Sequence, residues 1–220
     1  MVKFKLDTPL ICGHKGPIQD LDFSPFHSNI LATASSDGTC KIWMIPEGGY
    51  TKNQAECDAE LKGHSKKVSL LKFHPSANFT MASCGMECAV KIWDIQSENV
   101  QMSFDAVNSS PWGMDWNYDG SKIGLISKDK QLHIFDPRQP EQAMSTQAHE
   151  GNKAQRFKWL GNTGNILTSG FSEYNERQYA VFDTRAIEKP LTMRKLDTQN
   201  QVSWLHYDDA SKVVYVVNKG

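Results

Sequence analysis

This 220-residue sequence has no excess of charge of either sign, since it contains 24 lysine and arginine residues and 25 aspartate and glutamate residues. A net charge of −1 gives no overall field that would draw the chain to DNA, RNA or an anionic membrane, so a charged binding site must be a local patch. The sequence also lacks an apolar run near the roughly 20 residues that span a bilayer, and residues 1–7 lack the apolar core of a signal peptide. These absences predict a soluble, intracellular protein.

Cysteine is scarce, and its spacing is irregular. An odd number of cysteines predicts reduced thiols in a cytosolic setting and not a disulfide framework; the five are Cys12, Cys40, Cys57, Cys84 and Cys88. Cys84 and Cys88 form a C-x3-C pair, but a zinc site needs two further ligands at metal spacing, and the histidines are dispersed. We therefore expect neither a metal nor another cofactor.

Helical periodicity is absent, and a repeat takes its place. Gly63-His64 follows Gly13-His14 by 50 residues, and Lys91-Ile92-Trp93 follows Lys41-Ile42-Trp43 by the same interval. Short β-type runs lie between these markers, and Asp37-Gly38 is a hairpin signal because glycine tolerates the positive φ of such turns. One unit has been copied, with a Gly-His connection, two strands, a tight turn and a third strand.

Two further copies and part of another follow. The third copy has lost Gly-His and has Phe135 in the tryptophan position. The fourth begins near His149, has Phe182 in that position and carries a longer hairpin loop, Ser172 to Arg177. Repeats of roughly 40 to 50 residues with Gly-His and Trp-Asp-like endings indicate four-stranded propeller blades.

The predicted fold is therefore all-β, a partial WD40 β-propeller of four-stranded antiparallel blades with about four full repeats and a partial fifth. The approximate repeat boundaries are 12–60, 61–104, 105–147, 148–196 and 197–220. Because unpaired blade faces are apolar and invite aggregation, we expect residues 1–220 to be part of a longer chain and poorly soluble, or dependent on neighbouring segments, when alone.

Polar residues in the repeats predict a buried network inside the blades. A WD40 blade links a tryptophan indole, a serine hydroxyl, a histidine and an aspartate by hydrogen bonds, and the first repeat carries all four: Trp43, Ser35, His14 and Asp37. Later repeats carry other members of this network: His64, Trp93, Ser127 and Asp129. The second repeat has Gly85 and Glu87 where the first has Ser35 and Asp37, so we expect its network to be partial and its blade softer.

The same residues could be interpreted as a hydrolase triad of His14, Ser35 and Asp37. Catalysis would need an exposed nucleophile and an oxyanion site in a pocket, and active sites are seldom copied from repeat to repeat. The structural interpretation is favoured, and no enzymatic activity is expected.

A locally basic face is predicted despite the neutral total charge. In a propeller blade, the connection that enters the first strand and the hairpin between the second and third strands lie on the same rim. Basic residues gather in these segments and are candidate partner-binding residues: Lys15, Lys66, Lys67, Lys128, Lys130, Lys153, Arg156 and Arg177. Such loops suit an acidic protein surface, although single lysines often only keep a rim solvated. Without an arginine-rich stretch or interleaved aromatics, nucleic acid is not expected as a partner.

Several segments resemble the coronin family: CGHKGPIQDLDFSP (12–25), IPEGG (45–49), LKGHSKKV (61–68) and SKDKQLHIFDPR (127–138). The fourth repeat carries the most specific wording, AHEGNKAQRFKW (148–159), SGFSEYNERQYAVFDTR (169–185) and LDTQN (196–200). The resemblance covers essentially the whole chain. It implies a seven-bladed propeller that binds filamentous actin and helps to organise the actin cytoskeleton, in the cytoplasm at the actin-rich cortex.

The resemblance also implies site residues and partners. Lys66 and Lys67 lie in a basic loop motif of the family, and Arg177 lies in its SERQ-like loop, here NERQ. A further basic position at the family's N-terminus has no counterpart before Lys3. A C-terminal extension and coiled coil, absent from this sequence, would oligomerise the protein and contact the Arp2/3 complex. A tandem-propeller branch of the family implies an alternative function, a WD40 scaffold or adaptor in vesicle trafficking or ubiquitin-ligase recruitment; direct membrane insertion is not expected.

Overall fold

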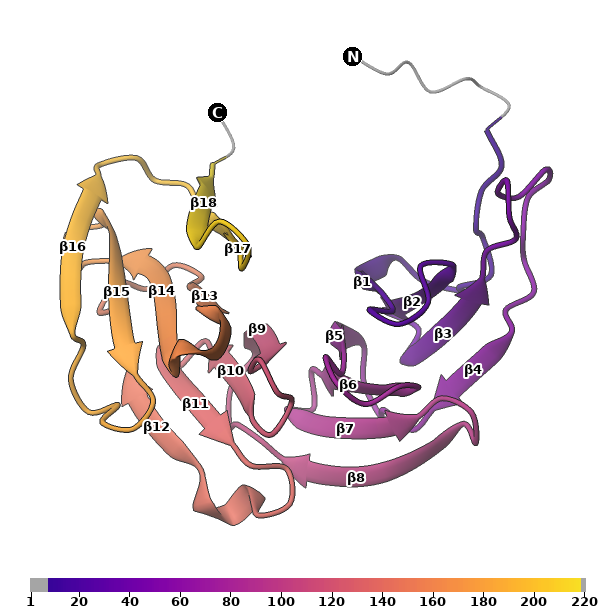
Figure 1. The fold of residues 1–220 in the computed structure, drawn as a ribbon, viewed down its shortest axis with the longest axis horizontal. Helices are drawn as coiled ribbons and strands as arrows, with labels where there is room; N and C mark the ends of the chain where they lie inside the picture. Colours follow the sequence, from indigo (N-terminus) through magenta and orange to yellow (C-terminus); the bar gives the residue numbers. More distant parts are fainter. Residues whose placement is uncertain (1–7, 219–220) are drawn as a thin grey trace. The chain divides into compact units, whose positions relative to one another are not determined.

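The computed structural model describes residues 8–218, whose regular structure is β except for two short 3-10 helices, η1 (Pro140–Gln142) and η2 (Gly161–Thr163). The strands form four four-stranded antiparallel sheets and one two-stranded sheet (Figure 1). Their bounds are β1 (Ile18–Phe23), β2 (Ile30–Ser35), β3 (Thr39–Met44), β4 (Ala59–Lys62), β5 (Val68–Phe73), β6 (Thr80–Gly85), β7 (Ala89–Asp94), β8 (Asn99–Asp105), β9 (Pro111–Trp116), β10 (Ile123–Ser127), β11 (Gln131–Phe135), β12 (Met144–Gln147), β13 (Arg156–Trp159), β14 (Asn165–Phe171), β15 (Arg177–Asp183), β16 (Thr192–Asp197), β17 (Trp204–Asp208) and β18 (Val213–Val217).

The chain forms two compact units. Unit 1 contains residues up to His74 together with Asn78–Ser103, and it holds blade 1 (β1–β4) and blade 2 (β5–β8). Unit 2 contains Pro75–Ala77 and the residues from Phe104 onward, and it holds blade 3 (β9–β12), blade 4 (β13–β16) and the β17–β18 hairpin.

Blade 1 illustrates how the sequence forms these sheets. β2 is buried along its whole length because it pairs with β1 on one side and with β3 on the other. The core of unit 1 lies where blade 1 meets blade 2, and it contains Ile30, Ala32 and Ala34 of β2, Cys40 and Ile42 of β3, and Val68, Leu71 and Phe73 of β5. Small residues on β2 allow the two sheets to approach, so the blades share one apolar core.

Unit 2 repeats this arrangement between blade 3 and blade 4. Phe157 and Trp159 of β13 pack in one cluster with Ile126 of β10 and with Leu132 and Ile134 of β11. The first strand of one blade thus covers the second and third strands of the blade before it, as in unit 1.

Each four-stranded blade has a residue in the left-handed region at its second-to-third-strand hairpin. Blade 1 uses Gly38 (φ 84°), whereas the other blades use Cys88 (φ 73°), Lys130 (φ 69°) and Asn175 (φ 61°). Only glycine adopts this conformation without a steric cost, so three of the hairpins hold a side chain in a conformation that costs about 1 kcal/mol.

The predicted all-β fold, with four full blades and a partial fifth, is confirmed. The expected boundary between residues 60 and 61 falls inside β4. Among residues 8–218, no helix is long and apolar enough to cross a membrane.

Candidate binding surface

The polar network of blade 1 runs from the core to the rim. Trp43 Nε1 donates to Thr33 Oγ1 (2.9 Å), Thr33 Oγ1 lies 2.8 Å from His14 Nε2, and His14 Nδ1 lies 2.9 Å from Asp37 Oδ2. A neutral imidazole protonated at Nδ1 satisfies every bond of this chain. Asp37 also accepts hydrogen bonds from the Thr39 hydroxyl (2.7 Å) and from the backbone N–H of Lys15. Despite the opposing effect of partial burial, the bonds from Thr39, His14 and Lys15 hold the pKa of Asp37 well below its usual range.

Ser35 does not have the place that the sequence predicted for it. Its hydroxyl donates to the backbone oxygens of Gly16 (3.0 Å) and Pro17 (3.2 Å), and it is Thr33 that links Trp43 to His14. Trp43 pairs with Leu31 across the ladder, so Thr33 is its diagonal neighbour and Ser35 lies one further pair toward the rim. The correct hydroxyl is therefore two residues earlier.

The network of blade 2 is complete, so the prediction of a partial one is wrong. Trp93 Nε1 donates to Ser83 Oγ (2.7 Å), Ser83 lies 2.6 Å from His64 Nε2, and His64 Nδ1 contacts Glu87. Glu87 replaces an aspartate, and its Oε2 is buried without a partner. Burial lowers the pKa of His64, whereas the bond to His64 helps to lower the pKa of Glu87.

Unit 2 departs from this pattern. In blade 3, Ser127 donates to Asp129 (2.6 Å), and Asp129 lies 3.8 Å from His133. In blade 4, Gln178 Nε2 lies 3.0 Å from His149 Nδ1, and His149 Nε2 lies 2.9 Å from Thr168 Oγ1. Burial without a carboxylate lowers the pKa of His149 to about 4.

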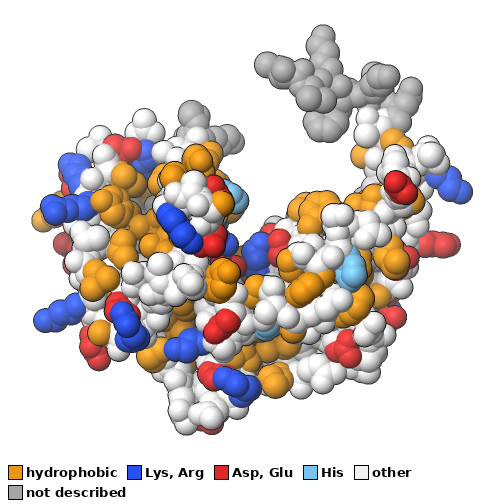
Figure 2. Space-filling model, in the orientation of Figure 1, with side chains coloured by type: hydrophobic (Ala, Val, Ile, Leu, Met, Phe, Trp, Pro, Cys, Tyr) orange, Lys and Arg blue, Asp and Glu red, His pale blue; other side chains and the backbone are white. Residues whose placement is uncertain are grey.

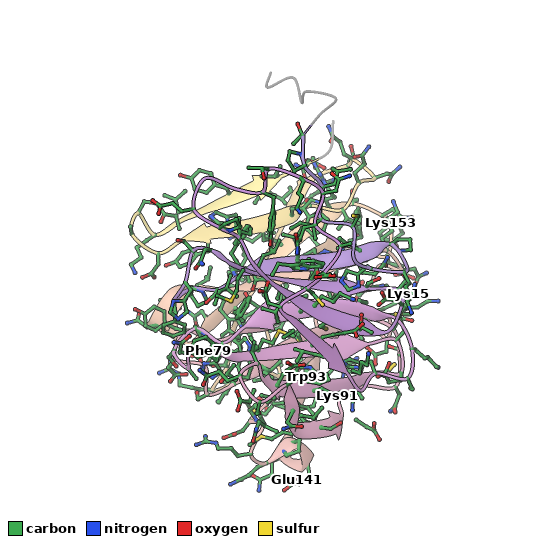
Figure 3. All side chains as sticks on the ribbon, turned by 90° about the vertical axis from the view of Figure 1, so that its right-hand side faces the viewer. Lys15, Phe79, Lys91, Trp93, Glu141 and Lys153 are labelled. Carbon is green, nitrogen blue, oxygen red and sulfur yellow. The ribbon has the colours of Figure 1, made fainter. Side chains whose placement is uncertain are left out.

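The rim of unit 1 presents three exposed lysines, Lys15, Lys66 and Lys67, and none of them makes an ion pair within the described residues. The backbone oxygen of Lys66 lies 3.3 Å from the position that a Cβ would take at Gly38, so the blade 1 hairpin abuts the connection that enters blade 2. In Figure 3, Lys15 lies at the edge of unit 1 opposite the edge that carries Phe79. We call Lys15, Lys66 and Lys67 the lysine rim.

The predicted basic residues of unit 2 are more engaged. Lys128 is exposed, but Lys130 Nζ donates to the backbone oxygen of Glu150 (2.6 Å). Lys153 Nζ donates to Asn200 Oδ1 (3.0 Å) and lies 4.7 Å from the centre of the Phe171 ring.

Arg156 is engaged in a similar way. Its Nη1 donates to the backbone oxygen of Trp112 (2.8 Å), and its Cζ lies 4.7 Å above the ring of Trp204. Lys130, Lys153 and Arg156 therefore connect neighbouring blades within unit 2.

Arg177 is buried, with 2% of its surface exposed, so its predicted role as an exposed binding residue is wrong. Its Nε donates to Asp197 Oδ1 (2.7 Å), and its Nη2 donates to Asp197 Oδ2. The register shifts between Arg177 and Gln178, and this bulge interrupts the alternation of faces along β15.

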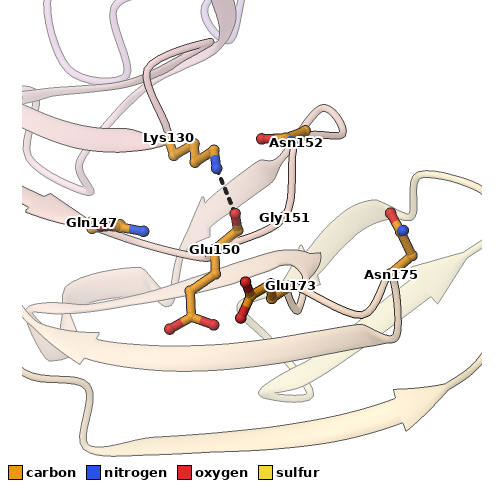
Figure 4. A pocket seen from close by; sticks show the side chains of 7 residues that line it. All are labelled: Lys130, Gln147, Glu150, Gly151, Asn152, Glu173 and Asn175. Atoms are coloured by element: carbon orange, nitrogen blue, oxygen red, sulfur yellow. Dashed lines mark hydrogen bonds between the residues drawn. The ribbon is translucent and has the colours of Figure 1, made fainter.

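A polar pocket of about 430 Å³ lies on unit 2 between the blade 3 and blade 4 hairpins (Figure 4). Its lining consists of Lys130, Gln147, Glu150, Gly151, Asn152, Glu173 and Asn175. The carboxylates of Glu150 and Glu173 point toward the same side of the pocket in Figure 4. The basic character of the unit 1 rim therefore does not extend to this region of unit 2.

The structure does not support the hypothetical hydrolase triad of His14, Ser35 and Asp37. Ser35, the nucleophile of a hypothetical triad, is fully buried and bonds to backbone oxygens. Among residues 8–218, no group of three or more histidine, cysteine, aspartate or glutamate side chains could hold a metal ion, and all five cysteines are free thiols.

Comparisons with known proteins agree with this architecture. The family model described as "WD domain, G-beta repeat" matches residues 7–44 and 55–94. Coronin-like protein crn1 of Schizosaccharomyces pombe is 34% identical over 218 residues, which are 96% of this chain and 36% of that protein. Coronin-2A of Bos taurus is 34% identical, over 98% of this chain and 42% of its own length.

A solved structure gives the same result. The crystal structure of the WD40 domain of Toxoplasma gondii coronin superposes with a TM-score of 0.89 at 32% identity, and the match covers 94% of this chain and 54% of that one. The chain thus spans between about a third and a half of the length of these three proteins.

Proposed function

Because the chain belongs to the coronin family of WD40 proteins, we propose that it binds actin filaments through the lysine rim and so takes part in organising the actin cytoskeleton. A coronin WD40 domain is a binding platform and not an enzyme. Its work is therefore done by surface chemistry, and the proposal concerns which surface meets the filament.

The observation that supports the lysine rim is that its acidic side chains point into the blades, whereas its basic side chains are exposed. Asp37 and Glu87 lie in the hairpins beside the connections that carry the lysines, but both carboxylates turn inward to His14 and His64. The lysine side chains stay exposed, so the outward potential of this rim is positive although the whole chain is nearly neutral. A positive rim complements an acidic filament surface, which raises the association rate and fixes the orientation of binding.

The other candidate positions have different weights in this proposal. Lys128 is the exposed basic residue of the blade 3 hairpin and remains a candidate contact. Three other candidates make hydrogen bonds to neighbouring blades: Lys130, Lys153 and Arg156. Arg177 is no longer a candidate contact because it is buried. Binding to the Arp2/3 complex and assembly through a coiled coil are expectations for segments other than these repeats.

Co-sedimentation with actin filaments tests the proposal. We expect the variant with Lys66→Glu and Lys67→Glu to bind about tenfold more weakly than the unaltered chain, because two attractive charges become repulsive. Binding by the unaltered chain should weaken as salt is raised, since exposed charges are screened over about 10 Å at 0.1 M.

The matched control carries the same change of charge elsewhere, Lys52→Glu with Lys189→Glu. Both residues are exposed, and both lie in connections that lead to the outer strands, β4 and β16. Equal binding by the two double variants would refute the lysine rim as the contact. Failure of the unaltered chain to bind filaments would refute the actin function and favour a role as an adaptor.

A further inference from the structure

Two positions distinguish the hairpin of blade 2 from that of blade 1. Glu87 lies fifty positions after Asp37, and Gly85 lies fifty positions after Ser35. A glutamate is one methylene longer than an aspartate, yet each carboxylate contacts the histidine of its own network. The longer side chain must therefore fold back inside the blade, and that requires space.

Gly85 provides this space. A Cβ atom at Gly85 would lie 2.7 Å from Glu87 Oε1 and closer still to Oε2, so the carboxylate occupies the volume that a side chain would fill. Oε2 is buried there without a hydrogen-bond partner. The φ of Gly85 is not positive, so the backbone at this position does not itself require a glycine. The requirement comes from the carboxylate.

The hairpin that carries Glu87 is bonded to the connection that carries two lysines of the lysine rim. Glu87 accepts a hydrogen bond from the backbone N–H of Ser65, and the backbone N–H of Met86 donates to the backbone oxygen of Lys67 (2.9 Å). The carboxylate therefore lies beside the lysine rim, although it is directed inward to His64.

Acids that point outward on this chain pair with neighbouring bases. In the connections between strands, Asp136 pairs with Arg138 and Asp209 pairs with Lys212, both at 2.7 Å. Figure 2 shows further acidic and basic side chains next to one another on one face of the molecule. An outward Glu87 would in the same way neutralise part of the lysine rim.

We propose that Gly85 keeps the lysine rim positive, because it gives Glu87 the space to turn inward and away from Lys66 and Lys67. This inference rests on the proposed function, since the charge of the rim matters for binding the filament. Gly85 is a positioning residue that acts through Glu87. A side chain at Gly85 would meet the far end of a flexible glutamate and not the backbone, so the expected response is a rotation of Glu87 toward the rim.

Co-sedimentation of the variant Gly85→Ala with actin filaments tests this role. We expect the variant to bind about fivefold more weakly than the unaltered chain, because the displaced carboxylate of Glu87 cancels part of the positive charge. Its binding should also fall less steeply as salt is raised, since fewer uncompensated charges remain to be screened. Circular dichroism verifies that the variant is folded.

Removing the charge of the displaced side chain is the decisive step. The double variant Gly85→Ala with Glu87→Gln has the same steric change but exposes a neutral amide, so it should recover the affinity of the unaltered chain. Ser83→Ala is the control for stability, because it breaks the network of the same blade but leaves the space at Gly85 open. If the double variant binds as weakly as Gly85→Ala, or if Ser83→Ala weakens binding equally, the proposal is overturned.

A second position tests the effect of charge without altering the interior of the blade. Ser65 is exposed on the connection itself, so Ser65→Glu places a carboxylate on the rim while Gly85 and Glu87 stay as they are. We expect this variant to weaken binding to a similar extent and Ser65→Gln to leave it unchanged. If Ser65→Glu binds as well as the unaltered chain, an outward acid does not affect the rim, and the proposal fails even where Gly85→Ala does not fold.

Urea denaturation separates this proposal from the proposed function, because it needs no filament. Gly85→Ala should lower the urea concentration at the midpoint of unfolding. Adding Glu87→Asp should recover most of that loss, since the shorter aspartate leaves room for a side chain, as Asp37 does for Ser35 in blade 1. If Glu87→Asp recovers nothing, Gly85 does not make room for Glu87, whatever the filament assay gives. Failure of the unaltered chain to bind filaments would count against the actin function alone.

Discussion

Unit 1 and unit 2 satisfy their buried polar groups in different ways. In blades 1 and 2, a tryptophan, a hydroxyl, a histidine and a carboxylate form the same chain twice. In blades 3 and 4, phenylalanine replaces the tryptophan of the third strand, so no indole N–H needs an acceptor at that position. The shared fold therefore tolerates different residues at these buried positions, and it does not require one particular set.

Blade 4 also reverses the direction of hydrogen bonding at its histidine. His14 uses Nδ1 toward a carboxylate, and its Nε2 accepts from Thr33. His149 instead accepts from the Gln178 amide at Nδ1, so its Nε2 donates to Thr168, whose hydroxyl donates to the backbone oxygen of Ala180. The opposite tautomer serves the same structural purpose.

The largest effect is expected at the Arg177–Asp197 ion pair of blade 4. Removing its acid by Asp197→Ala leaves Arg177 buried and without its counter-charge, and we expect a clear loss in the free energy of unfolding. Urea denaturation followed by tryptophan fluorescence measures it.

Arg177→Met should cost less than Asp197→Ala, because it removes the charge that needs a partner. The double variant should regain part of the loss caused by Asp197→Ala alone. If Arg177→Met is the more damaging single change, the arginine contributes by packing and not by its charge.

A smaller effect is expected at the hydroxyl of blade 2. Ser83→Ala leaves both Trp93 Nε1 and His64 Nε2 without their partner, which should destabilise the chain by about 3 kcal/mol. Ser127→Ala, in blade 3, removes one bond to an exposed carboxylate and should cost about 1 kcal/mol. Equal losses in the two variants would show that the complete network adds nothing beyond a single bond.

The smallest effect is a dependence of stability on pH that comes from blade 4. Burial places the pKa of His149 at about 4 in the folded chain, against an ordinary value of 6.5. The neutral form is favoured in the folded state, so this contribution is complete above pH 6.5 and is lost as the pH falls toward 4. Between pH 7 and pH 5 the loss should be about 2 kcal/mol.

The variant His149→Gln should flatten that part of the stability profile. The pKa values of Asp37 and Glu87 are lowered by folding, so their contributions are lost only below the ordinary values of 3.8 and 4.5, outside this window. Burial also lowers the pKa values of His64 and His133, so some slope remains in the variant. A profile unchanged by His149→Gln would refute the assignment to blade 4.

Much of the fold could be predicted because its signals are local. The Gly-His pairs, the tryptophan positions and Asp37-Gly38 fix the spacing of the inner three strands, and the structure has strands there. The outer strands could not be found in this way, because the Gly-His pairs, the tryptophan positions and Asp37-Gly38 all lie in or next to the inner three strands.

The errors at individual residues have specific causes. Thr33 and Trp43 are ten positions apart, as are Ser83 and Trp93, so counting back from the tryptophan would have found the correct hydroxyl in both blades. Arg177 gave no such signal. A bulge moves it off the alternating pattern, and its partner Asp197 lies on the next strand.

The second-to-third-strand hairpins of the four blades share a backbone feature but not a residue type. Gly38, Cys88, Lys130 and Asn175 have the same backbone twist but have nothing in common as side chains. The four residue types at this position are unrelated, but all four have a positive φ. At Lys130 the freed side chain ties its hairpin to the next blade through the backbone oxygen of Glu150. The hairpins therefore share a backbone conformation although their side chains differ. Because the conformation does not fix the side chain, a residue at this position can make a contact with the next blade, as Lys130 does.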